Sequence, residues 1–256
     1  MKINTIKRKL MDDGYVLIKN FYRKEELKPL IDEIISLSSV FPQLDSFSPF
    51  GRQETDQVYS EKEMSMMYSN LRYLPTLAKL STSSKNLKLN TDLGLKFPLV
   101  MKSCNIRMDR PFNVKHLFHW HQDIVYLLGS MNALTFWIPL TSVNKENGSV
   151  EIVPKSHTKG ILPVDCLDQH KADQGGVMSP QDLRLRDEVQ GDSIIIDANL
   201  GDLVVFSQKL LHRSTPNFNK KIRYTVQLRY SDCMDEKFIE AACPMGDNNI
   251  FNTNYI

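Results

Sequence analysis

Apolar residues recur at helical spacing along the first part of the chain. Residues 4–14 follow this pattern and end in glycine, which predicts a short helix that stops at Gly14. The next run, Tyr15–Phe21, is rich in β-prone residues and predicts a strand. Residues 23–39 predict an amphipathic helix, with Pro29 in its first turn or two, where a missing N–H costs least. Its apolar face would carry Leu27, Leu30, Ile31, Ile34 and Ile35.

A loop and a second helical segment complete this part of the chain. Residues 41–53 are rich in proline, serine and glycine, which is typical of a loop. Residues 60–81 return to helical spacing, and Pro75 is expected to kink or break that helix. We therefore expect residues 1–96 to be helix-rich.

The pattern changes after Phe97 to short β-prone runs separated by Gly, Asn, Asp and Pro. The runs are residues 99–108, 132–140, 149–154, 192–197, 201–207 and 222–230. Glu146–Gly148 reads ENG between two of them, which is typical of a hairpin turn. Many short strands without intervening helices favour an antiparallel sandwich or jelly roll. The expected fold is mainly β with flanking α, the N-terminal helices being packed on one sheet.

The polar stretch 155–190 interrupts the β-prone runs. It contains QGG and SPQD and predicts a long excursion with little regular structure, of the kind that forms a rim or lid. The whole chain, residues 1–256, is expected to be a single domain. Its parts would be the helix-rich residues 1–96 and a jelly-roll core over residues 97–256.

Composition and charge narrow the class of protein. The chain is 41% hydrophobic and 24% charged, as is ordinary for a globular protein, and its net charge of +2 argues against nucleic acid or an anionic membrane as partner. No apolar run approaches the ~20 residues of a membrane span, and no signal peptide is visible. The cysteines, Cys104, Cys166, Cys233 and Cys243, form no CxxC pair. These features predict a cytoplasmic protein with reduced thiols, without indicating an oligomeric state.

Candidate metal ligands crowd into residues 116–126, HLFHWHQDIVY. If residues 118–125 form a strand, His119, His121 and Asp123 share one face, because side chains two apart point the same way. A His-x-Asp pair can chelate one ion, since the long imidazole and the short carboxylate reach a common point. A metal site of this kind needs a third protein ligand besides the His-x-Asp pair.

The third ligand and an anion partner are found downstream. His212 follows the predicted strand 201–207, which a sandwich could place near the first site. Two histidines and one carboxylate form the facial triad of non-haem Fe(II) oxygenases. Arg223 lies eleven residues after His212 at the start of a β-prone run, and its guanidinium is suited to pairing with a dicarboxylate.

With these motifs the chain resembles the phytanoyl-CoA dioxygenase family of Fe(II)/2-oxoglutarate-dependent oxygenases. The resemblance rests on WHQD (Trp120–Asp123), on Trp137–Gly160, and on Gly201–Tyr224 with its HRSTPN and IRY motifs; residues 10–27 also resemble the family's opening. It covers most of the chain. A lone HxD is a weak signal, but HxD, a distal histidine and the later arginine together are specific.

The resemblance implies a double-stranded β-helix of cupin-like form and a set of site residues. His121, Asp123 and His212 would bind Fe(II), and Arg223 would bind the C5 carboxylate of 2-oxoglutarate. The expected helpers are a hydroxyl at Ser214, an aromatic ring at Tyr126, a basic residue at Arg107 or Arg110, and a structural histidine at His157. With O₂ as the other cosubstrate, the expected reaction hydroxylates a small molecule and releases succinate and CO₂.

Several alternatives remain open. His119 could pair with His121 in a cupin-like site, which would leave Asp123 without a role. A halogenase of this fold would carry a small residue in place of Asp123, so the carboxylate argues against one. A cupin-like binding module without catalysis, or a relative that desaturates or epimerises its substrate, would share the fold. The family name is no evidence for an acyl-CoA substrate; members with similar motifs act on diverse small molecules, sugars or secondary metabolites, and the sequence does not identify which.

Overall fold

The computed structural model describes residues 2–39, 61–115, 117–174, 179–189 and 191–242. Its helices are α1 (Ile3–Asp13), α2 (Lys24–Ser39), α3 (Glu61–Leu71), α4 (Pro75–Ser81), α5 (Ser84–Leu93), α6 (Gln169–Asp173) and α7 (Glu236–Glu240). Its strands are β1 (Tyr15–Ile18), β2 (Pro98–Val100), β3 (Asn105–Asp109), β4 (Leu134–Pro139), β5 (Val150–Ile152), β6 (Val164–Cys166), β7 (Leu183–Leu185), β8 (Ile194–Ile195), β9 (Leu203–Ser207), β10 (His212–Ser214) and β11 (Arg223–Asp232). Short 3₁₀ helices cover Asp123–Val125 and Ser156–Lys159.

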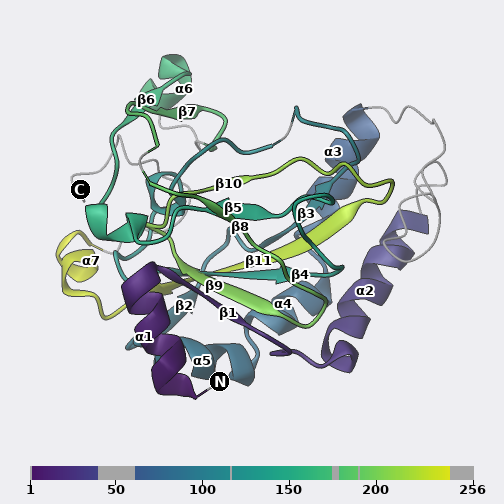
Figure 1. Cartoon of the computed structure of the whole chain (residues 1–256), viewed down its shortest axis with the longest axis horizontal. Coiled ribbons are helices and arrows are strands. Elements are labelled where there is room, and N and C mark those ends of the chain that lie inside the picture. Colours follow the sequence, from purple (N-terminus) through teal and green to yellow (C-terminus); the bar gives the residue numbers. More distant parts are fainter. Residues whose placement is uncertain (1, 40–60, 116, 175–178, 190, 243–256) are drawn as a thin grey trace.

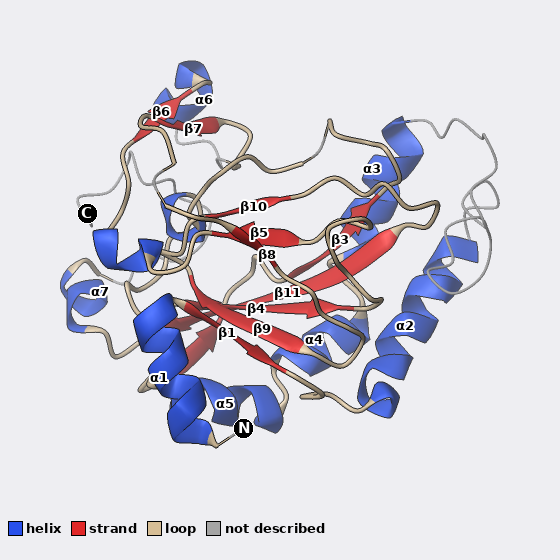
Figure 2. Ribbon diagram, viewed as in Figure 1, coloured by secondary structure: helices blue, strands red, loops and turns tan. Residues whose placement is uncertain are grey.

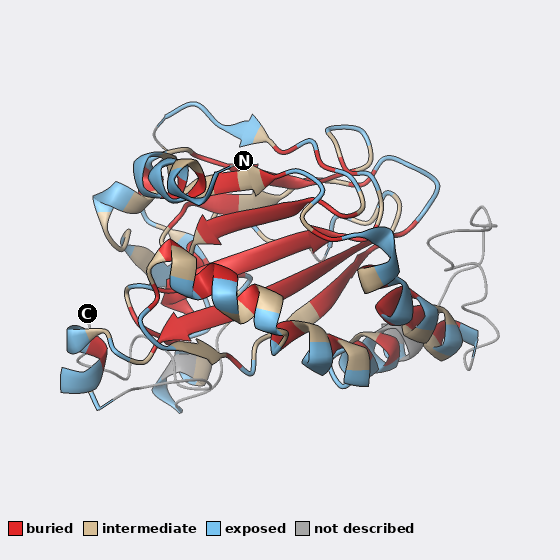
Figure 3. Ribbon diagram, turned by 90° about the horizontal axis from the view of Figure 1, so that it is seen from below, coloured by how far each residue is buried: buried red, intermediate tan, exposed pale blue. Residues whose placement is uncertain are grey.

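Two antiparallel sheets lie face to face and helices cover the outer side of one of them (Figures 1 and 2). The major sheet has the order β1-β9-β4-β11-β2, with β3 also paired to β11, and the minor sheet has the order β10-β5-β8. Seen from below in Figure 3, the N-terminal helices lie against the buried strands of the major sheet. This is the expected jelly roll with helices packed on one sheet.

Strand β11 shows how the sequence builds a polar interior between the sheets. All ten of its residues are buried, so both of its faces are covered. Because side chains alternate along a strand, one row points to the helices and the other to the minor sheet. The first row, Tyr224, Val226, Leu228 and Tyr230, belongs to the helix-side core. The second row, Arg223, Thr225, Gln227 and Arg229, lines a pocket between the sheets.

The predicted N-terminal helices are confirmed. Helix α1 buries Ile6 and Leu10 and ends at Gly14, whose φ of 81° is left-handed. A Cβ at Gly14 would lie 2.4 Å from Nδ1 of His157, so glycine is required for packing as well as for its φ. Pro29 lies in the second turn of α2, and Pro75 starts α4 after the chain breaks at the end of α3.

Several details of the strand prediction are wrong. Residues 118–125 are not a strand: His121 makes one isolated bridge, and the chain turns into a 3₁₀ helix at Asp123. The ENG turn does not join a hairpin, because β4 before it belongs to the major sheet and β5 after it to the minor sheet. The run 99–108 divides into β2 and β3. The sequence reading also missed α5, which Ser83 caps through its side chain.

The described residues of the 155–190 excursion pack beside the segment that follows Asp123. Strands β6 and β7 form a small hairpin, and α6 lies between them in the chain. Leu183, Val164 and Ile161 pack against Ile124–Tyr126. The predicted loop 41–53 lies outside the described residues. Across the described segments, no helix has the length and apolar character needed to cross a membrane.

Candidate metal centre

His121 and His212 face each other from two chain segments. The backbone N–H of His121 donates to the carbonyl of His212 at 2.9 Å, and that of His212 donates back at 3.0 Å. His212 is the first residue of β10, so this bridge fastens the loop before Asp123 to the edge of the minor sheet. The two imidazole rings lie 4.2 Å apart between centroids. Both imidazole rings therefore face the same point between the two sheets.

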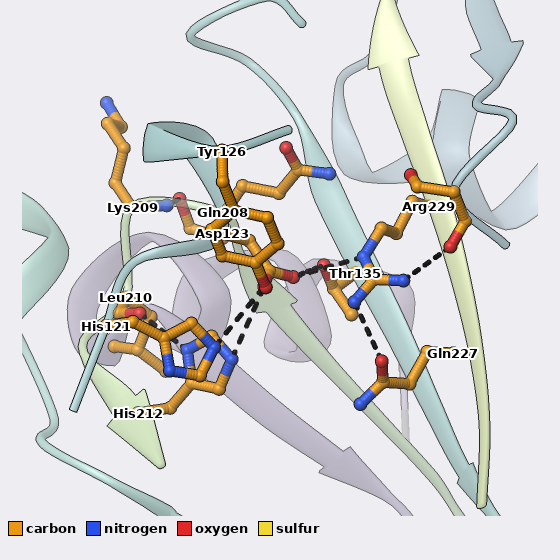
Figure 4. A network of polar contacts seen from close by, with 12 residues as sticks. His121, Asp123, Tyr126, Thr135, Gln208, Lys209, Leu210, His212, Gln227 and Arg229 are labelled. Atoms are coloured by element: carbon orange, nitrogen blue, oxygen red, sulfur yellow. Dashed lines mark hydrogen bonds and ion pairs between the residues drawn. The ribbon is translucent and has the colours of Figure 1, made fainter. Parts of the chain in front are cut away.

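Each imidazole is held with its Nε2 atom toward Asp123 (Figure 4). Nδ1 of His121 lies 2.6 Å from the carbonyl oxygen of His119, and Nδ1 of His212 lies 2.9 Å from that of Leu210. A carbonyl oxygen only accepts, so both Nδ1 atoms carry a proton, which leaves the lone pair of a neutral imidazole on Nε2. The Nε2 atoms lie 3.7 Å and 3.6 Å from Oδ1 of Asp123. Donation from Nδ1 to a backbone carbonyl is the usual way of orienting a metal-ligating histidine.

Asp123 is buried and ionised. Its Oδ1 accepts a hydrogen bond from the hydroxyl of Tyr126, and its Oδ2 accepts from Oγ1 of Thr135 at 2.7 Å. Burial opposes the charge, but the guanidinium of Arg229 holds the pKa of Asp123 well below its usual value. Burial and the charge of Asp123 raise the pKa of Tyr126, so its phenol stays protonated and donates.

The three side chains fit a divalent metal ion. Their candidate ligand atoms lie within 4.8 Å of one another, and all three residues are buried. Burial and the neighbouring His121 lower the pKa of His212 to about 3, so that imidazole is neutral, as a metal ligand must be. Two imidazole nitrogens and one carboxylate oxygen form the donor set that suits non-haem Fe(II) and leaves coordination positions open.

A buried arginine lies in the same pocket. Nη2 of Arg223 lies 2.8 Å from Oδ2 of Asp109, while the Nε and Nη1 atoms of Arg223 are buried without a hydrogen-bond partner among the described residues. Asp109 also pairs with Arg107 at 2.8 Å, and although burial opposes its charge, the two guanidiniums hold its pKa below its usual range. A buried guanidinium with free N–H groups is suited to a carboxylate ligand.

Gly148 makes room for that guanidinium. Its φ is +78°, and a Cβ there would lie 2.6 Å from Nη1 of Arg223 and 2.8 Å from the carbonyl oxygen of Pro216. A side chain at this position would both strain the backbone and displace the arginine. The ENG sequence therefore forms a turn, closed by a bridge between Asn144 and Gly148, that makes room for Arg223.

The structure brings most of the predicted site residues to one pocket. Its lining residues are Arg107, Phe118, His121, Asp123, Tyr126, Trp137, Ser149, Val150, His212, Arg213, Ser214, Arg223, Thr225, Gln227 and Arg229. Arg110 is not among them, so Arg107 is the basic residue that faces the site. The side chain of His119 is exposed and contributes only its carbonyl. His157 bonds the carbonyl of Met11 at 3.0 Å, away from this pocket, and His116 lies outside the described residues.

Sequence reasoning missed Thr135, Thr225, Gln227 and Arg229. In the run RYTVQLRY every second residue from Arg223 to Arg229 is polar. Such alternation predicts one polar face on a strand. Thr135 gives a weaker signal, since it is a single polar residue in the apolar run of β4. The alternation in β11 is therefore a sequence signal for Thr225, Gln227 and Arg229.

Sequence comparison matches most of the chain to one protein family and to two kinds of known protein. A profile of the family described as phytanoyl-CoA dioxygenase (PhyH) matches residues 10–225. Ectoine dioxygenase of Bordetella parapertussis is 25% identical over 233 residues, covering 86% of this chain and 72% of that protein. Phytanoyl-CoA dioxygenase domain-containing protein 1 of Mus musculus is 22% identical over 268 residues, covering 86% and 88% respectively.

Solved structures share the fold at low sequence identity. The non-haem monooxygenase ThoJ superposes with a TM-score of 0.64 at 17% identity, covering 89% of this chain and 77% of ThoJ. EctD from S. alaskensis with bound Fe gives 0.61 at 14% identity, covering 97% and 80%. The epimerase SnoN in complex with Fe3+, alpha ketoglutarate and nogalamycin RO gives 0.61 at 16% identity, covering 90% and 83%.

Proposed function

The chain belongs to the phytanoyl-CoA dioxygenase (PhyH) family of Fe(II)/2-oxoglutarate-dependent dioxygenases, and from that premise we propose that it hydroxylates an unactivated C–H bond of a small molecule. The observation that carries the proposal is the buried cluster of His121, Asp123 and His212 beside the unsatisfied guanidinium of Arg223. The large majority of buried polar groups in proteins are hydrogen-bonded, so two open N–H positions on one buried guanidinium favour a ligand there.

In this proposal His121, Asp123 and His212 hold Fe(II) through two Nε2 atoms and Oδ1. When bound, Fe(II) with 2-oxoglutarate and O₂ supplies the oxidising chemistry, in which 2-oxoglutarate becomes succinate and CO₂ and one oxygen atom of O₂ enters the product. The hydrogen bonds that the Nδ1 atoms donate to backbone carbonyls keep both imidazoles in the ligating tautomer. The chain's own contribution is thus orientation and the exclusion of water.

Arg223 binds the far carboxylate of 2-oxoglutarate through its Nε and Nη1 atoms. Ser214 lies at the same pocket and offers a hydroxyl. The hydroxyl oxygens of Ser149 and Thr225 are likewise buried in the pocket without a partner among the described residues. Asp109 holds the guanidinium through an ion pair, and Gly148 leaves the space that it occupies. Tyr126 contributes through its bond to Asp123, and Arg107 through the carboxylate it shares with Arg223.

In this proposal the whole chain works as one domain. The excursion of residues 155–190 acts as a lid over the metal site. The packing of Leu183, Val164 and Ile161 against Ile124–Tyr126, next to Asp123, supports this role. A lid that closes over the site would keep water from the oxidising step.

Asp123 favours hydroxylation over halogenation. A carboxylate that binds the metal occupies the position that a halide would need. The name of one relative, ectoine dioxygenase, makes ectoine the first compound to test, followed by small sugars and secondary metabolites.

The test supplies the purified protein with Fe(II), 2-oxoglutarate, ¹⁸O₂ and each compound in turn. We expect slow succinate release without a substrate, faster release with the right one, and one ¹⁸O atom in the hydroxylated product. His212→Ala, which removes a metal ligand, is the inactive control. Chlorinated product would indicate a halogenase. Oxidised product without the label would indicate desaturation, epimerisation or ring closure. Bound iron without any succinate would indicate a binding module.

A further inference from the structure

Two polar residues on the inner face of the major sheet face the carboxylate of Asp123. Thr135 of β4 and Arg229 of β11 are register partners in neighbouring strands, so their side chains stand next to each other on the inner face of the sheet. Both residues are buried. Neither residue is one of the three candidate metal ligands, and neither is Arg223, the arginine proposed to bind the cosubstrate.

The pair binds one oxygen of Asp123 and leaves the other toward the histidines (Figure 4). Oδ2 accepts from Oγ1 of Thr135 at 2.7 Å and from Nε of Arg229 at 3.4 Å. Oδ1 faces both Nε2 atoms, and among the described residues it accepts only from the hydroxyl of Tyr126. A carboxylate oxygen has two lone pairs, so Oδ1 keeps one for a metal ion while those of Oδ2 are engaged.

Arg229 is itself held in place by other hydrogen bonds, so its guanidinium cannot move with the Asp123 carboxylate. Its Nη1 donates to the carbonyl of Ser103 at 2.6 Å, and its Nη2 donates to Oε1 of Gln227 at 2.7 Å. With Nε on Asp123, all three guanidinium nitrogens are engaged. Turning the Asp123 carboxylate would leave a buried guanidinium N–H and a buried hydroxyl without partners, which is costly.

We propose that Thr135 and Arg229 are positioning residues that make Asp123 a one-oxygen ligand and so keep a coordination position open. The inference rests on the proposed function, since it assumes that the metal binds at His121, Asp123 and His212. Three protein ligands and the two oxygens of 2-oxoglutarate leave one position on a six-coordinate ion. If Oδ2 were free to turn, it would take that position and compete with O₂.

Nitric oxide is the probe, because it binds Fe(II) where O₂ would and gives an electron paramagnetic resonance signal. Protein saturated with Fe(II) and 2-oxoglutarate is titrated with nitric oxide without oxygen. In Thr135→Val and Arg229→Gln the dissociation constant for nitric oxide should rise at least about tenfold, the lower end of the cost of losing an outer-shell partner. Thr135→Ser keeps the hydroxyl and should restore the wild-type value.

Lys19→Gln is the control, because it removes a different cation–carboxylate pair, Lys19 with Asp202 on the major-sheet side, outside the pocket. It should leave the affinity for nitric oxide unchanged. A purely structural role for Thr135 and Arg229 would lower iron affinity or melting temperature without changing nitric oxide binding at the saturated site, and that result would overturn the inference. Wild-type protein that binds no Fe(II) would overturn the proposed function itself, which separates the two failures.

Discussion

At the residue scale, the orientation of two imidazoles determines which atoms can bind a metal. His121 follows a loop and His212 begins a strand, yet both donate from Nδ1 to a carbonyl two residues earlier in the chain. His119 takes part only through that carbonyl. The side chain of His119 and that of His121 therefore have different roles although both belong to the same short motif.

Replacing a ligand should separate these roles. In His212→Ala and His121→Ala we expect Fe(II) affinity to fall by at least about 100-fold, because loss of an outer-shell partner alone costs about 10–100-fold. His119→Ala keeps the carbonyl and should stay within about twofold, as surface substitutions usually do. Anaerobic metal titration measures all three. Wild-type affinity in His212→Ala would contradict the triad, and a large loss in His119→Ala would move the ligand to that residue.

Arg223 should act on the cosubstrate and not on the metal. Arg223→Ala should raise the 2-oxoglutarate requirement about tenfold or more, since a buried charge-assisted pair contributes about 1.5–3 kcal/mol. Arg223→Lys should substitute poorly because lysine lacks the planar fork. Titration with 2-oxoglutarate at saturating Fe(II) measures the effect, with Arg110→Ala as the control outside the pocket. An unchanged requirement in Arg223→Ala would transfer the role to Arg107.

At the element scale, one amide joins the metal-binding segment to its surroundings. Gln122 lies between two candidate ligands and points the opposite way. Its Nε2 donates to the carbonyls of Gly160 at 2.9 Å and Lys209 at 2.6 Å, and its Oε1 accepts from the N–H of Leu162 at 2.8 Å. The start of the 155–190 excursion and the turn before β10 are thus both bound to the segment that carries His121 and Asp123.

Gln122→Met should loosen this junction. The substitution keeps the size of the side chain but leaves three partly buried backbone groups unsatisfied, so we expect a loss of about 2–4 kcal/mol in the free energy of unfolding. Amide exchange at Leu162 should accelerate. Gln122→Glu, which keeps the acceptor for Leu162, is the control and should protect that amide. Unchanged stability and exchange in Gln122→Met would show that the excursion is held by its apolar contacts alone.

At the scale of the whole molecule, the metal site lies between the two sheets. His212 belongs to the minor sheet, while Asp123 is fastened to the major sheet through Thr135 and Arg229. A metal ion that binds both would link the sheets in the folded state. Because such a site does not exist in the unfolded chain, metal binding must stabilise the fold.

Loading should therefore raise the melting temperature. With Co(II), which avoids oxidation, at 100 times its dissociation constant we expect about 2.7 kcal/mol of stabilisation. For a chain of this size that corresponds to roughly 5–10 °C. Differential scanning calorimetry measures the shift, and His212→Ala should abolish it. A shift of the same size in His212→Ala would place the metal elsewhere on the protein.

The sequence by itself determined the elements whose cause is local. Apolar spacing and the glycine after α1 predicted that helix, and proline predicted the break before α4, because backbone geometry acts over a few residues. The β-prone runs predicted the class of fold. The HxD motif, His212 and Arg223 were recognisable as candidates because the chemistry restricts both their types and their order.

Only the tertiary structure decided how these elements meet. Asp123 reaches the histidines through a 3₁₀ turn and not through strand alternation, and β4 and β5 separate into different sheets although a turn sequence joins them. The choice of Arg107 over Arg110, and the hold of Thr135 and Arg229 on one carboxylate oxygen, depend on strands that are distant in sequence. Such contacts arise from the register between strands and from burial, which local sequence patterns do not specify.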